Sequence, residues 1–493
     1  MKRLLMTTAL AAAPFSFATM AVADCDDLSP GGGDTVTCTA TDIFDGPDSI
    51  ETRALDDGSK DVVVIVETDA VIDTSASGDD AIKLQDDGAF ISNSGSIIGG
   101  DEAIVGGEGL VVANQGLIAA PDHAIVGENE DGDPASDLEI YNGGRLNGTA
   151  TIVAGGDAIK GGDGLYLENY GVIAAGDDLI QGESATGPAN DVSVLNFGEM
   201  TAVDKGITVG DGLVLDNAFG AVIQSLENEA VEAGDNAVIY NAGGIFGFDD
   251  AIQVGEGAFI ENYGTIENTQ TAADIAADLT LEAQDAIDID SGYIYNEGTI
   301  LSVTNAAIDY DPGASESVIE NFGIISGTIG VNTDDADTAS QFVSNAGLIE
   351  GTEGTALFLG QGDDALLNVT GSEIAGGADF GAGADLMVFD ASFFDMTTGL
   401  FADGSLFAGG EGEDTLIFEG VASIETLLTD LGGDVFKLSI FGALGQTDLT
   451  LTSWENIVFA DALAPVPLPA GAVLFGTALA GLGLAGRRRR AAK

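Results

Sequence analysis

The chain has 493 residues and a formal net charge of −68, with 82 Asp and Glu against 14 Lys and Arg. So acidic a surface repels nucleic acid and anionic lipid and attracts cations, which excludes nucleic-acid binding. The 45% hydrophobic content, against 19% charged residues, predicts a folded chain, and the length calls for several domains or one elongated repeat.

The first 23 residues, MKRLLMTTALAAAPFSFATMAVA, combine a basic start, a short apolar stretch and a small-x-small ending. This pattern is typical of a secretory signal peptide and predicts cleavage before Asp24. Residues 24–80 are then expected to form an N-terminal cap. They contain both cysteines of the chain, Cys25 and Cys38, and in an oxidising compartment such a close pair predicts a disulfide.

Residues 81–392 repeat one phrase: an apolar run, an Asn, a Gly two residues later and a second aliphatic run, as in ENYGVIAAG. A third apolar run surrounds an Ala-Ile pair, as at Ala158–Ile159. The repeated Asn residues are spaced by 21 to 34 positions. They are Asn93, Asn114, Asn142, Asn169, Asn196, Asn217, Asn241, Asn262, Asn296, Asn321, Asn345 and Asn368.

Short alternating runs between Gly, Asn and Asp predict strands rather than helices. Three such strands in each repeat describe one coil of a parallel β-helix, because a single coil cannot bury its own inward side chains. We therefore expect an all-β, right-handed parallel β-helix (solenoid) of about a dozen three-strand coils. Each Asn is expected at a tight corner with a left-handed backbone and bonded to the Asn of the next coil, and the following Gly is expected to supply a positive φ.

The repeat resembles the passenger regions of autotransporter adhesins, and DTVTCTAT at 34–41 is similar to their first strand. The resemblance implies a β-helix displayed outside the cell. It does not extend to autotransport, because a different tail stands where that family has its translocator barrel.

Three acidic, Gly-rich segments, LGQGDDALL, FGAGADLMV and GGEGEDTLI, resemble the RTX nonapeptide. The resemblance implies calcium held by Gly carbonyls and an Asp carboxylate at a turn. The candidate ligand residues are Gly362, Asp364, Gly383, Asp385, Gly412 and Asp414. Leu359 and Phe380 replace the first Gly of two copies, and the alternative is that these segments are acidic corners of the solenoid without an ion.

Parallel β-helices also include polysaccharide lyases and hydrolases. A lyase generally needs a basic side chain to bind uronic carboxylates, and residues 206–436 contain no Lys, Arg or His. A glycosidase needs only paired carboxylates, which leaves a carbohydrate-active enzyme of that kind as the alternative. His123, the sole histidine, is expected to be a corner residue. We predict a non-enzymatic protein without catalytic residues.

The C-terminal part loses the Asn repeat at 393–460 and gains Phe, which predicts a capping β-segment, followed by a linker at 461–465. Residues 466–493 begin with Val466, Pro467, Leu468, Pro469 and Ala470. The 17 uncharged residues from 470 to 486 reach the short limit of a transmembrane helix, and a basic stop follows. This stop consists of Arg487, Arg488, Arg489 and Arg490.

This tail resembles the VPLPA-CTERM variant of the PEP-CTERM sorting signals, and a plain membrane anchor is the alternative. The resemblance implies a Gram-negative bacterium, transient anchoring in the inner membrane, processing by an exosortase-like protease and delivery to the cell surface or extracellular matrix. The expected function is therefore a structural or adhesion protein of the surface or biofilm matrix. Its expected partners are the sorting protease and an extracellular polysaccharide or cell surface.

Overall fold

The computed structural model describes residues 23–40, 50–51, 60–145, 150–313, 315–334, 336–369, 372–390, 406–419, 426–442 and 445–460. It divides into two compact units, residues 1–287 and 288–493, which we describe separately. The fold is an all-β parallel solenoid of the right-handed type, with about 14 coils over the two units and almost no helix. The fold class predicted from the repeat is thus confirmed. The expected sorting signal at 466–493 and its transmembrane helix lie outside the described residues.

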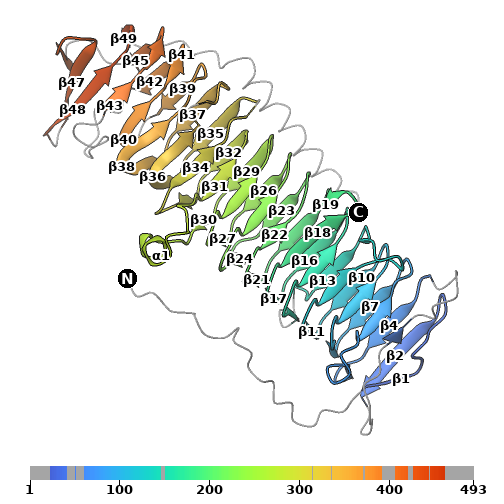
Figure 1. Cartoon of the computed structure of the whole chain (residues 1–493). Helices are drawn as coiled ribbons and strands as arrows, with labels where there is room; N and C mark the ends of the chain where they lie inside the picture. The colour runs from blue at the N-terminus through green and yellow to red at the C-terminus, as the bar shows by residue number, and fades with distance from the viewer. Residues whose placement is uncertain are drawn as a thin grey trace. The chain divides into compact units, whose positions relative to one another are not determined.

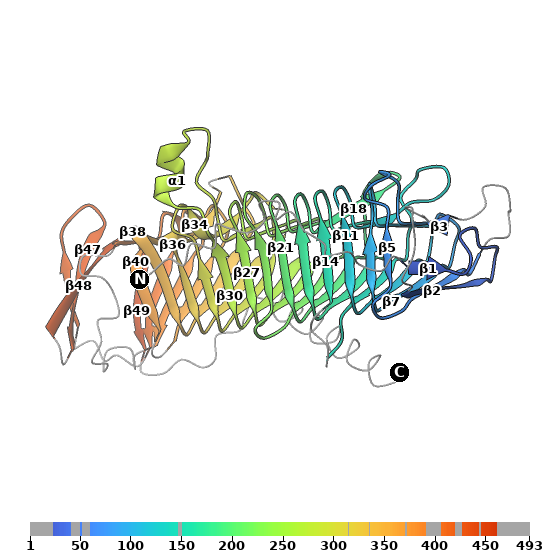
Figure 2. The same ribbon diagram turned by 90° about the horizontal axis from the view of Figure 1, so that it is seen from below.

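In the first unit the strands stand in three columns, and each pairs in parallel with the strands at the same place in the neighbouring coils (Figures 1 and 2). The first column contains β2 (Thr35–Ala40), β4 (Val63–Val66), β7 (Phe90–Asn93), β10 (Val111–Asn114), β13 (Glu139–Asn142), β16 (Tyr166–Asn169), β20 (Ser193–Asn196), β23 (Val214–Asn217), β26 (Val238–Asn241) and β29 (Ala258–Asn262). The second contains β5 (Val71–Asp73), β8 (Ser96–Ile98), β11 (Leu117–Ala120), β14 (Thr151–Ala154), β17 (Val172–Ala175), β21 (Glu199–Ala202), β24 (Val222–Ser225), β27 (Gly244–Gly247) and β30 (Thr265–Asn268). The third contains β3 (Ile50–Glu51), β6 (Ile82–Leu84), β9 (Ile104–Gly106), β12 (Ile125–Gly127), β15 (Ile159–Gly161), β18 (Ile180–Ser184), β22 (Ile207–Thr208), β25 (Val231–Ala233) and β28 (Ile252–Val254).

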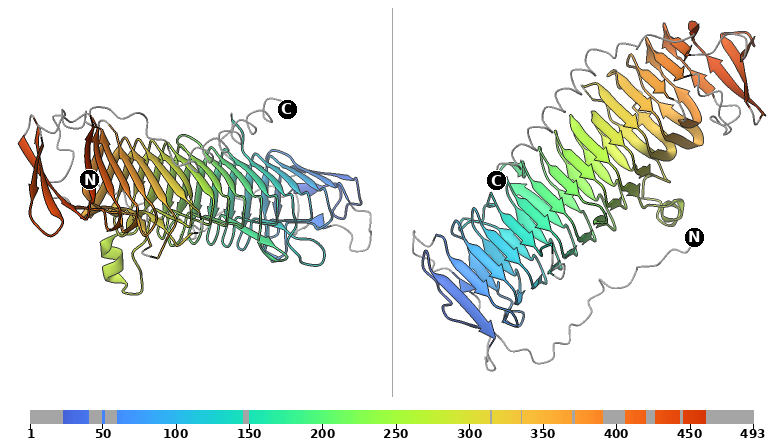
Figure 3. Two further views of the ribbon diagram at one scale, coloured as in Figure 1. Left: turned by 90° about the horizontal axis from the view of Figure 1, so that it is seen from above. Right: turned by 180° about the vertical axis from the view of Figure 1, so that it is seen from behind.

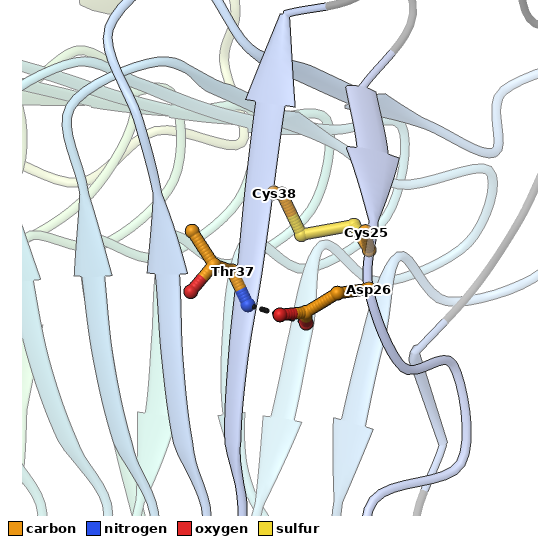
Figure 4. The surroundings of a disulfide bond; sticks show 4 residues. All are labelled: Cys25, Asp26, Thr37 and Cys38. Atoms are coloured by element: carbon orange, nitrogen blue, oxygen red, sulfur yellow. Dashed lines mark hydrogen bonds between the residues drawn. A yellow bond between two sulfur atoms is a disulfide. The ribbon is translucent and has the colours of Figure 1, made fainter.

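The start of the first unit is closed by an antiparallel strand. β1 (Ala23–Cys25) pairs with β2, and Cys25 lies opposite Cys38, to which it is joined by a disulfide (Figure 4). Beside it, Asp26 Oδ1 accepts the N–H of Thr37 at 2.8 Å. β2 in turn pairs in parallel with β4, so solenoid pairing already begins within the segment 24–80 that we expected to be a cap.

The core follows from the alternation of side chains along each strand. In the first column the inward positions are aliphatic and fully buried, and they lie directly above one another in register. They are Ile91, Val112, Ile140, Leu167, Val194, Leu215, Ile239 and Ile260. Each coil thereby covers the apolar interior of the next, which an isolated coil would leave in water.

The repeat Asn residues of the first unit form an internal ladder from Asn93 to Asn262. Every member is buried, and its Nδ2 donates to the Oδ1 of the next member at 2.8–3.0 Å. Asn196 illustrates the complete set of bonds. Its Nδ2 also donates to the Val222 carbonyl at 3.0 Å, and its Oδ1 also accepts the N–H of Gly198 at 3.1 Å. Both amide hydrogens and both acceptor sites are used.

The expected left-handed backbone at these corners is wrong. Among the described residues, no ladder Asn has a positive φ; many of the positive values fall two residues before a first-column strand, as at Gly88, Asp137 and Gly164. The Gly two positions after the Asn is needed for close approach instead. A Cβ on Gly198 would lie 2.1 Å from the Gly171 carbonyl oxygen and 3.0 Å from Asn169 Nδ2. The ladder bonds draw successive coils together, and a side chain there would hold them apart.

Insertions leave the stack of the first unit at more than one corner. One forms β19 (Gly187–Pro188), which pairs antiparallel with the end of β18. Another, at 267–285, contains α1 (Ala272–Ala277), which stands away from the strands in Figure 3. Thr271 and Asp274 form a capping box at the start of this helix.

The second unit begins near β31 (Ile287–Ile289). Its Asn column contains β32 (Gly292–Asn296), β35 (Ser317–Asn321), β37 (Gln341–Asn345), β39 (Ala365–Asn368), β42 (Leu386–Asp390), β45 (Thr415–Glu419) and β49 (Asn456–Ala460). The remaining strands are β33 (Thr299–Leu301), β34 (Ala306–Tyr310), β36 (Ile324–Thr333), β38 (Leu348–Phe358), β40 (Glu373–Asp379), β41 (Ala382–Gly383), β43 (Leu406–Ala408), β44 (Glu411–Gly412), β46 (Thr426–Asp430), β47 (Val435–Gly442) and β48 (Gly445–Thr452).

The expected three strands per coil do not hold throughout the second unit. β36 and β38 each run through the place where the first unit has a corner between its second and third columns. Their pairing contains register shifts between Gly327 and Ile329, as in a β-bulge. Glycine permits the bend without a polar corner residue, so the two short strands merge into one.

The end of the second unit differs from the Asn repeat. The ladder of this unit runs from Asn296 to Asn368 at 2.8–2.9 Å and stops where Phe389 occupies the next position. β46, β47 and β48 form an antiparallel meander, while β45 and β49 continue the parallel pairing. Trp454 is buried, and its Nε1 donates to the Phe407 carbonyl at 3.0 Å.

Within the described ranges, no helix has both the length and the apolar character needed to span a bilayer.

We predict that Asn196→Ala lowers the free energy of unfolding by about 2–3 kcal/mol, because it leaves buried donors and acceptors of two neighbouring coils unpaired. Chemical denaturation of the purified protein measures the change. The matched control is Gln224→Ala, which removes an outward-facing amide from β24. Equal stabilities of the two variants would contradict a structural role for the ladder.

Candidate functional site

The three aspartates proposed as calcium ligands lie on consecutive coils of the second unit, where each directly precedes a strand of the Asn column. Asp385 Oδ1 accepts the N–H of Asp364 at 2.8 Å, and Asp414 Oδ1 accepts the N–H of Asp385 at 3.0 Å. At the start of the series, Asp364 Oδ1 accepts the N–H of Gln341 at 2.7 Å. We call Asp364, Asp385 and Asp414 the aspartate column.

The second carboxylate oxygens of this column are buried and unpaired. The three residues are 1%, 2% and 0% exposed, and none of their Oδ2 atoms has a hydrogen-bond partner among the residues that the structure describes. Burial penalises the charged form, and it raises the pKa of Asp364 to about 8 and that of Asp385 to about 7. Burial also raises the pKa of Asp414. Each carboxyl therefore favours either a proton or a cation at its free oxygen.

The glycines of the same motif bring successive coils into close contact. A Cβ on Gly383 would lie 1.9 Å from the Gly362 carbonyl oxygen and 3.1 Å from Asp385 Oδ1. A Cβ on Gly412 would lie 1.5 Å from the Gly383 carbonyl oxygen. The Gly-x-Asp spacing thus has a packing cause of its own, since it lets β41 and β44 pair while the carboxylate folds back over the chain.

A hard cation such as Ca²⁺ requires several oxygen ligands. In the aspartate column each carboxylate would contribute singly, together with backbone carbonyls of the Gly-rich corner. Among the residues that the structure describes, groups of three acidic side chains with oxygens within 4.8 Å of one another lie elsewhere, in the first unit.

A second polar column, not singled out from the sequence, stands in the first unit directly before the third-column strands. His123 Nδ1 accepts the N–H of Asp157 at 3.0 Å, and Asp157 Oδ1 accepts that of Asp178 at 3.0 Å. Asp178 Oδ1 accepts the N–H of Lys205 at 3.0 Å. In the sequence, each member of this column is the residue directly before the Ala-Ile pair of its repeat, or before the two residues that replace that pair. This charged corner column consists of Asp80, Glu102, His123, Asp157, Asp178, Lys205, Glu229, Asp250 and Asp285.

Each of the two close acidic groups combines two residues of this column with an adjacent exposed aspartate. In the first, Asp80, Asp101 and Glu102 lie together. Burial and the hydrogen bond with Asp80 raise the pKa of Glu102 to about 8. Burial also acts to raise the pKa of Asp80, but its hydrogen bonds with Glu102 and Lys83 outweigh this and lower it. One proton therefore sits preferentially on Glu102 and is shared with an ionised partner.

The second group joins Asp157 and Asp178 to the exposed Asp177. Asp157 Oδ2 lies 3.4 Å from His123 Nδ1 and 3.9 Å from Lys160 Nζ. Burial raises the pKa of Asp178 to about 7, and the neighbouring carboxylates add to the shift. This group therefore combines buried acids with two of the few basic side chains of the chain.

A cavity of about 210 Å³ opens beside the charged corner column. Its lining is polar and titratable, and it brings acids of three different coils to one space. The lining residues are Glu102, His123, Val126, Gly127, Glu128, Gly132, Pro134, Lys160, Gly161 and Glu183. His123 thus lies at a corner and also borders a cavity, which the sequence pattern did not indicate.

A third polar column is exposed and lies before the first-column strands. Asn190 Oδ1 accepts the N–H of Asp211, Asp211 Oδ1 that of Asp235, and Asp235 Oδ1 that of Glu256, each at 2.9 Å. The same bond thus recurs at another corner of the first unit, here in contact with water.

Comparison of the chain with protein-family models, with curated proteins and with solved structures gave no match.

We predict that the aspartate column makes the protein less stable as the pH rises. The folded-state pKa values of about 8 for Asp364 and about 7 for Asp385 lie above the usual value of 3.8, so the folded state holds protons that the unfolded state releases. Stability from these groups is complete below about pH 4 and is lost as the pH rises through about 8. The melting temperature should fall between pH 5 and pH 8, and less so in Asp364→Asn/Asp385→Asn.

The matched control is Asp211→Asn/Asp235→Asn, which removes two charges from the exposed column and keeps its backbone bonds. At pH 8 the addition of Ca²⁺ should raise the melting temperature of the wild type and of this control, but not that of the aspartate-column variant. A uniform response of all three proteins would contradict a calcium site at these residues.

Proposed function

We propose that the chain is an exported structural or adhesion protein of the bacterial cell surface or extracellular matrix. The observation that carries this proposal is the Asn ladder, whose buried amides bond coil to coil in each unit. Such an array maintains its form through repetition and presents a long series of equivalent outer positions. This architecture suits a protein whose task is to span distance and present a surface.

Export is supported by the disulfide between Cys25 and Cys38. Disulfides persist in oxidising compartments, and this one lies directly after the signal-peptide pattern of residues 1–23. The acidic composition is consistent with an extracellular medium that contains cations, because these ions screen the repulsion between stacked carboxylates. On this proposal the calcium-binding aspartate column would make the protein a calcium-stabilised matrix component.

The tail at 466–493 supports a route to the surface. Its VPLPA motif, apolar stretch and basic stop are proposed to hold the chain in the inner membrane until an exosortase-like protease removes the tail. The mature protein would then associate with the cell surface or with an extracellular polysaccharide.

The route is tested by fractionating cells that express an epitope-tagged chain, with the tag at the exposed loop tip Asp131–Gly132. The wild type should be found in the surface and extracellular fractions in a shortened form. Pro467→Ala/Pro469→Ala should leave a full-length form in the inner membrane. The matched control is Pro465→Ala, which changes a proline just outside the motif. Surface delivery of the double variant at the wild-type level would contradict the sorting proposal.

A second candidate function is carbohydrate cleavage by carboxylates alone. The observation that favours it is Glu102, which borders the 210 Å³ cavity with a pKa raised to about 8. A carboxyl that keeps its proton near neutral pH can act as a general acid, and Glu128 or Glu183, which line the same cavity, would supply the base or nucleophile.

If this second function is correct, the purified protein releases reducing ends from a polysaccharide, and the rate falls above about pH 8 as Glu102 loses its proton. Glu102→Gln should lower the rate by roughly 10²-fold or more, because it removes the acid. Glu199→Gln, which changes an exposed glutamate of β21, should not. Absence of cleavage, or equal rates for the two variants, argues against an enzyme.

A further inference from the structure

One corner of the first unit carries large aromatic side chains that the core does not use. Tyr170, Phe197 and Tyr263 directly follow the ladder Asn of their coils, and Phe219 lies one position further along on the coil after Phe197. The backbone N–H groups of Tyr170, Phe197 and Tyr263 all donate to the ladder Asn carbonyl of the preceding coil, so these residues occupy equivalent places. We call these four residues the aromatic corner.

Three of the four residues of the aromatic corner are exposed to solvent, and Tyr170 is partly buried. Phe219 is 93% exposed, Tyr263 50% and Phe197 38%. Burial of a Phe ring is favourable, so exposed aromatic rings gathered at one corner mark an interaction site. Because the rings of Phe197 and Phe219 are in solvent, they are available to a ligand.

Two rings of the corner form a stacked pair. Tyr170 and Phe197 stack with centroids 4.6 Å apart and planes inclined by 7°. The coils on either side carry Gly143 and Ala218 at the equivalent place, which offer no side chain or only a methyl group. Among the described residues of this column, neither neighbouring coil therefore places a ring or a long side chain against the outer faces of the pair.

Polar groups beside the rings are held in fixed orientations. Glu168 accepts the hydroxyl of Tyr170 at 2.8 Å and that of Tyr166 at 3.2 Å. Arg145 Nε donates to the Tyr170 hydroxyl at 3.3 Å. Flat apolar rings flanked by oriented carboxylate, hydroxyl and guanidinium groups match a pyranose, which has an apolar C–H face and a rim of hydroxyl groups.

We infer that the aromatic corner binds a neutral polysaccharide chain along the direction in which the coils are stacked. Tyr170, Phe197 and Phe219 lie on three consecutive coils, which follow one another at ~4.8 Å, so these rings suit an extended polymer. Neutrality follows from charge, because the net charge of −68 and the nearby Glu168 repel uronate and sulfate groups. This inference rests on the proposed function, whose polysaccharide partner it specifies.

The test measures binding of the purified protein to three neutral polymers, cellulose, a β-1,3-glucan and dextran, and to alginate as a polyuronate. The wild type should bind at least one neutral polymer and not alginate. Phe197→Ala/Phe219→Ala should weaken that binding by roughly tenfold or more, since each aromatic contact contributes about 0.5–1.5 kcal/mol. Tyr170→Phe, which keeps the ring and loses the bonds to Glu168 and Arg145, should weaken it less.

The matched control is Phe90→Ala, which removes a 38% exposed ring from the outer face of β7, away from the corner. It should bind as the wild type does, and unchanged melting temperatures should show that all variants fold. Three results overturn the inference: no binding to any neutral polymer, preference for alginate, or equal loss in the Phe90→Ala control. Because surface delivery is measured separately in cells, failure here leaves the sorting result intact.

Discussion

A buried amide that must satisfy four hydrogen-bonding positions governs the construction of this chain. The ladder Asn can use both its hydrogens and both its lone pairs only when the next coil places another Asn directly above it, at 2.8–3.0 Å. A shift of one residue along the strand would turn the amide outward and the core aliphatics with it. The ladder therefore fixes register, while the aliphatic column supplies most of the favourable free energy.

The fold was predictable because its signal repeats. One Asn followed by a Gly is weak evidence, but twelve Asn positions at intervals near one coil, ten of them with a Gly two residues later, leave few alternatives. Local backbone conformation was less accessible. Gly198 was expected to adopt a positive φ and instead makes room for the Gly171 carbonyl, while Asp137 takes the left-handed conformation before its strand. Glycine permits both a positive φ and a close approach of another backbone, and the sequence alone does not show which of the two a given position requires.

The candidate sites were predictable only in part, for a related reason. The aspartate column carried a recognisable spacing, so its residues were identified, although the burial of Asp364 Oδ2 was not. The charged corner column escaped notice because its members differ in chemistry: His123, Asp178 and Lys205 share a place in the coil and not a side-chain type. Its acceptors repeat one task, accepting a backbone N–H one coil away. A repeated structural position is therefore not recognisable from the sequence where several side-chain types can make the same hydrogen bond.

The disulfide at the first coil has a consequence for how the first unit comes apart. In a stack where each coil is bonded only to the one before and the one after, terminal coils have one neighbour fewer and fray first. Cys25 and Cys38 tie the closing strand β1 to β2 at that vulnerable end. Proteases and mechanical load act on frayed ends, so a single cross-link at this position protects many coils that carry none of their own.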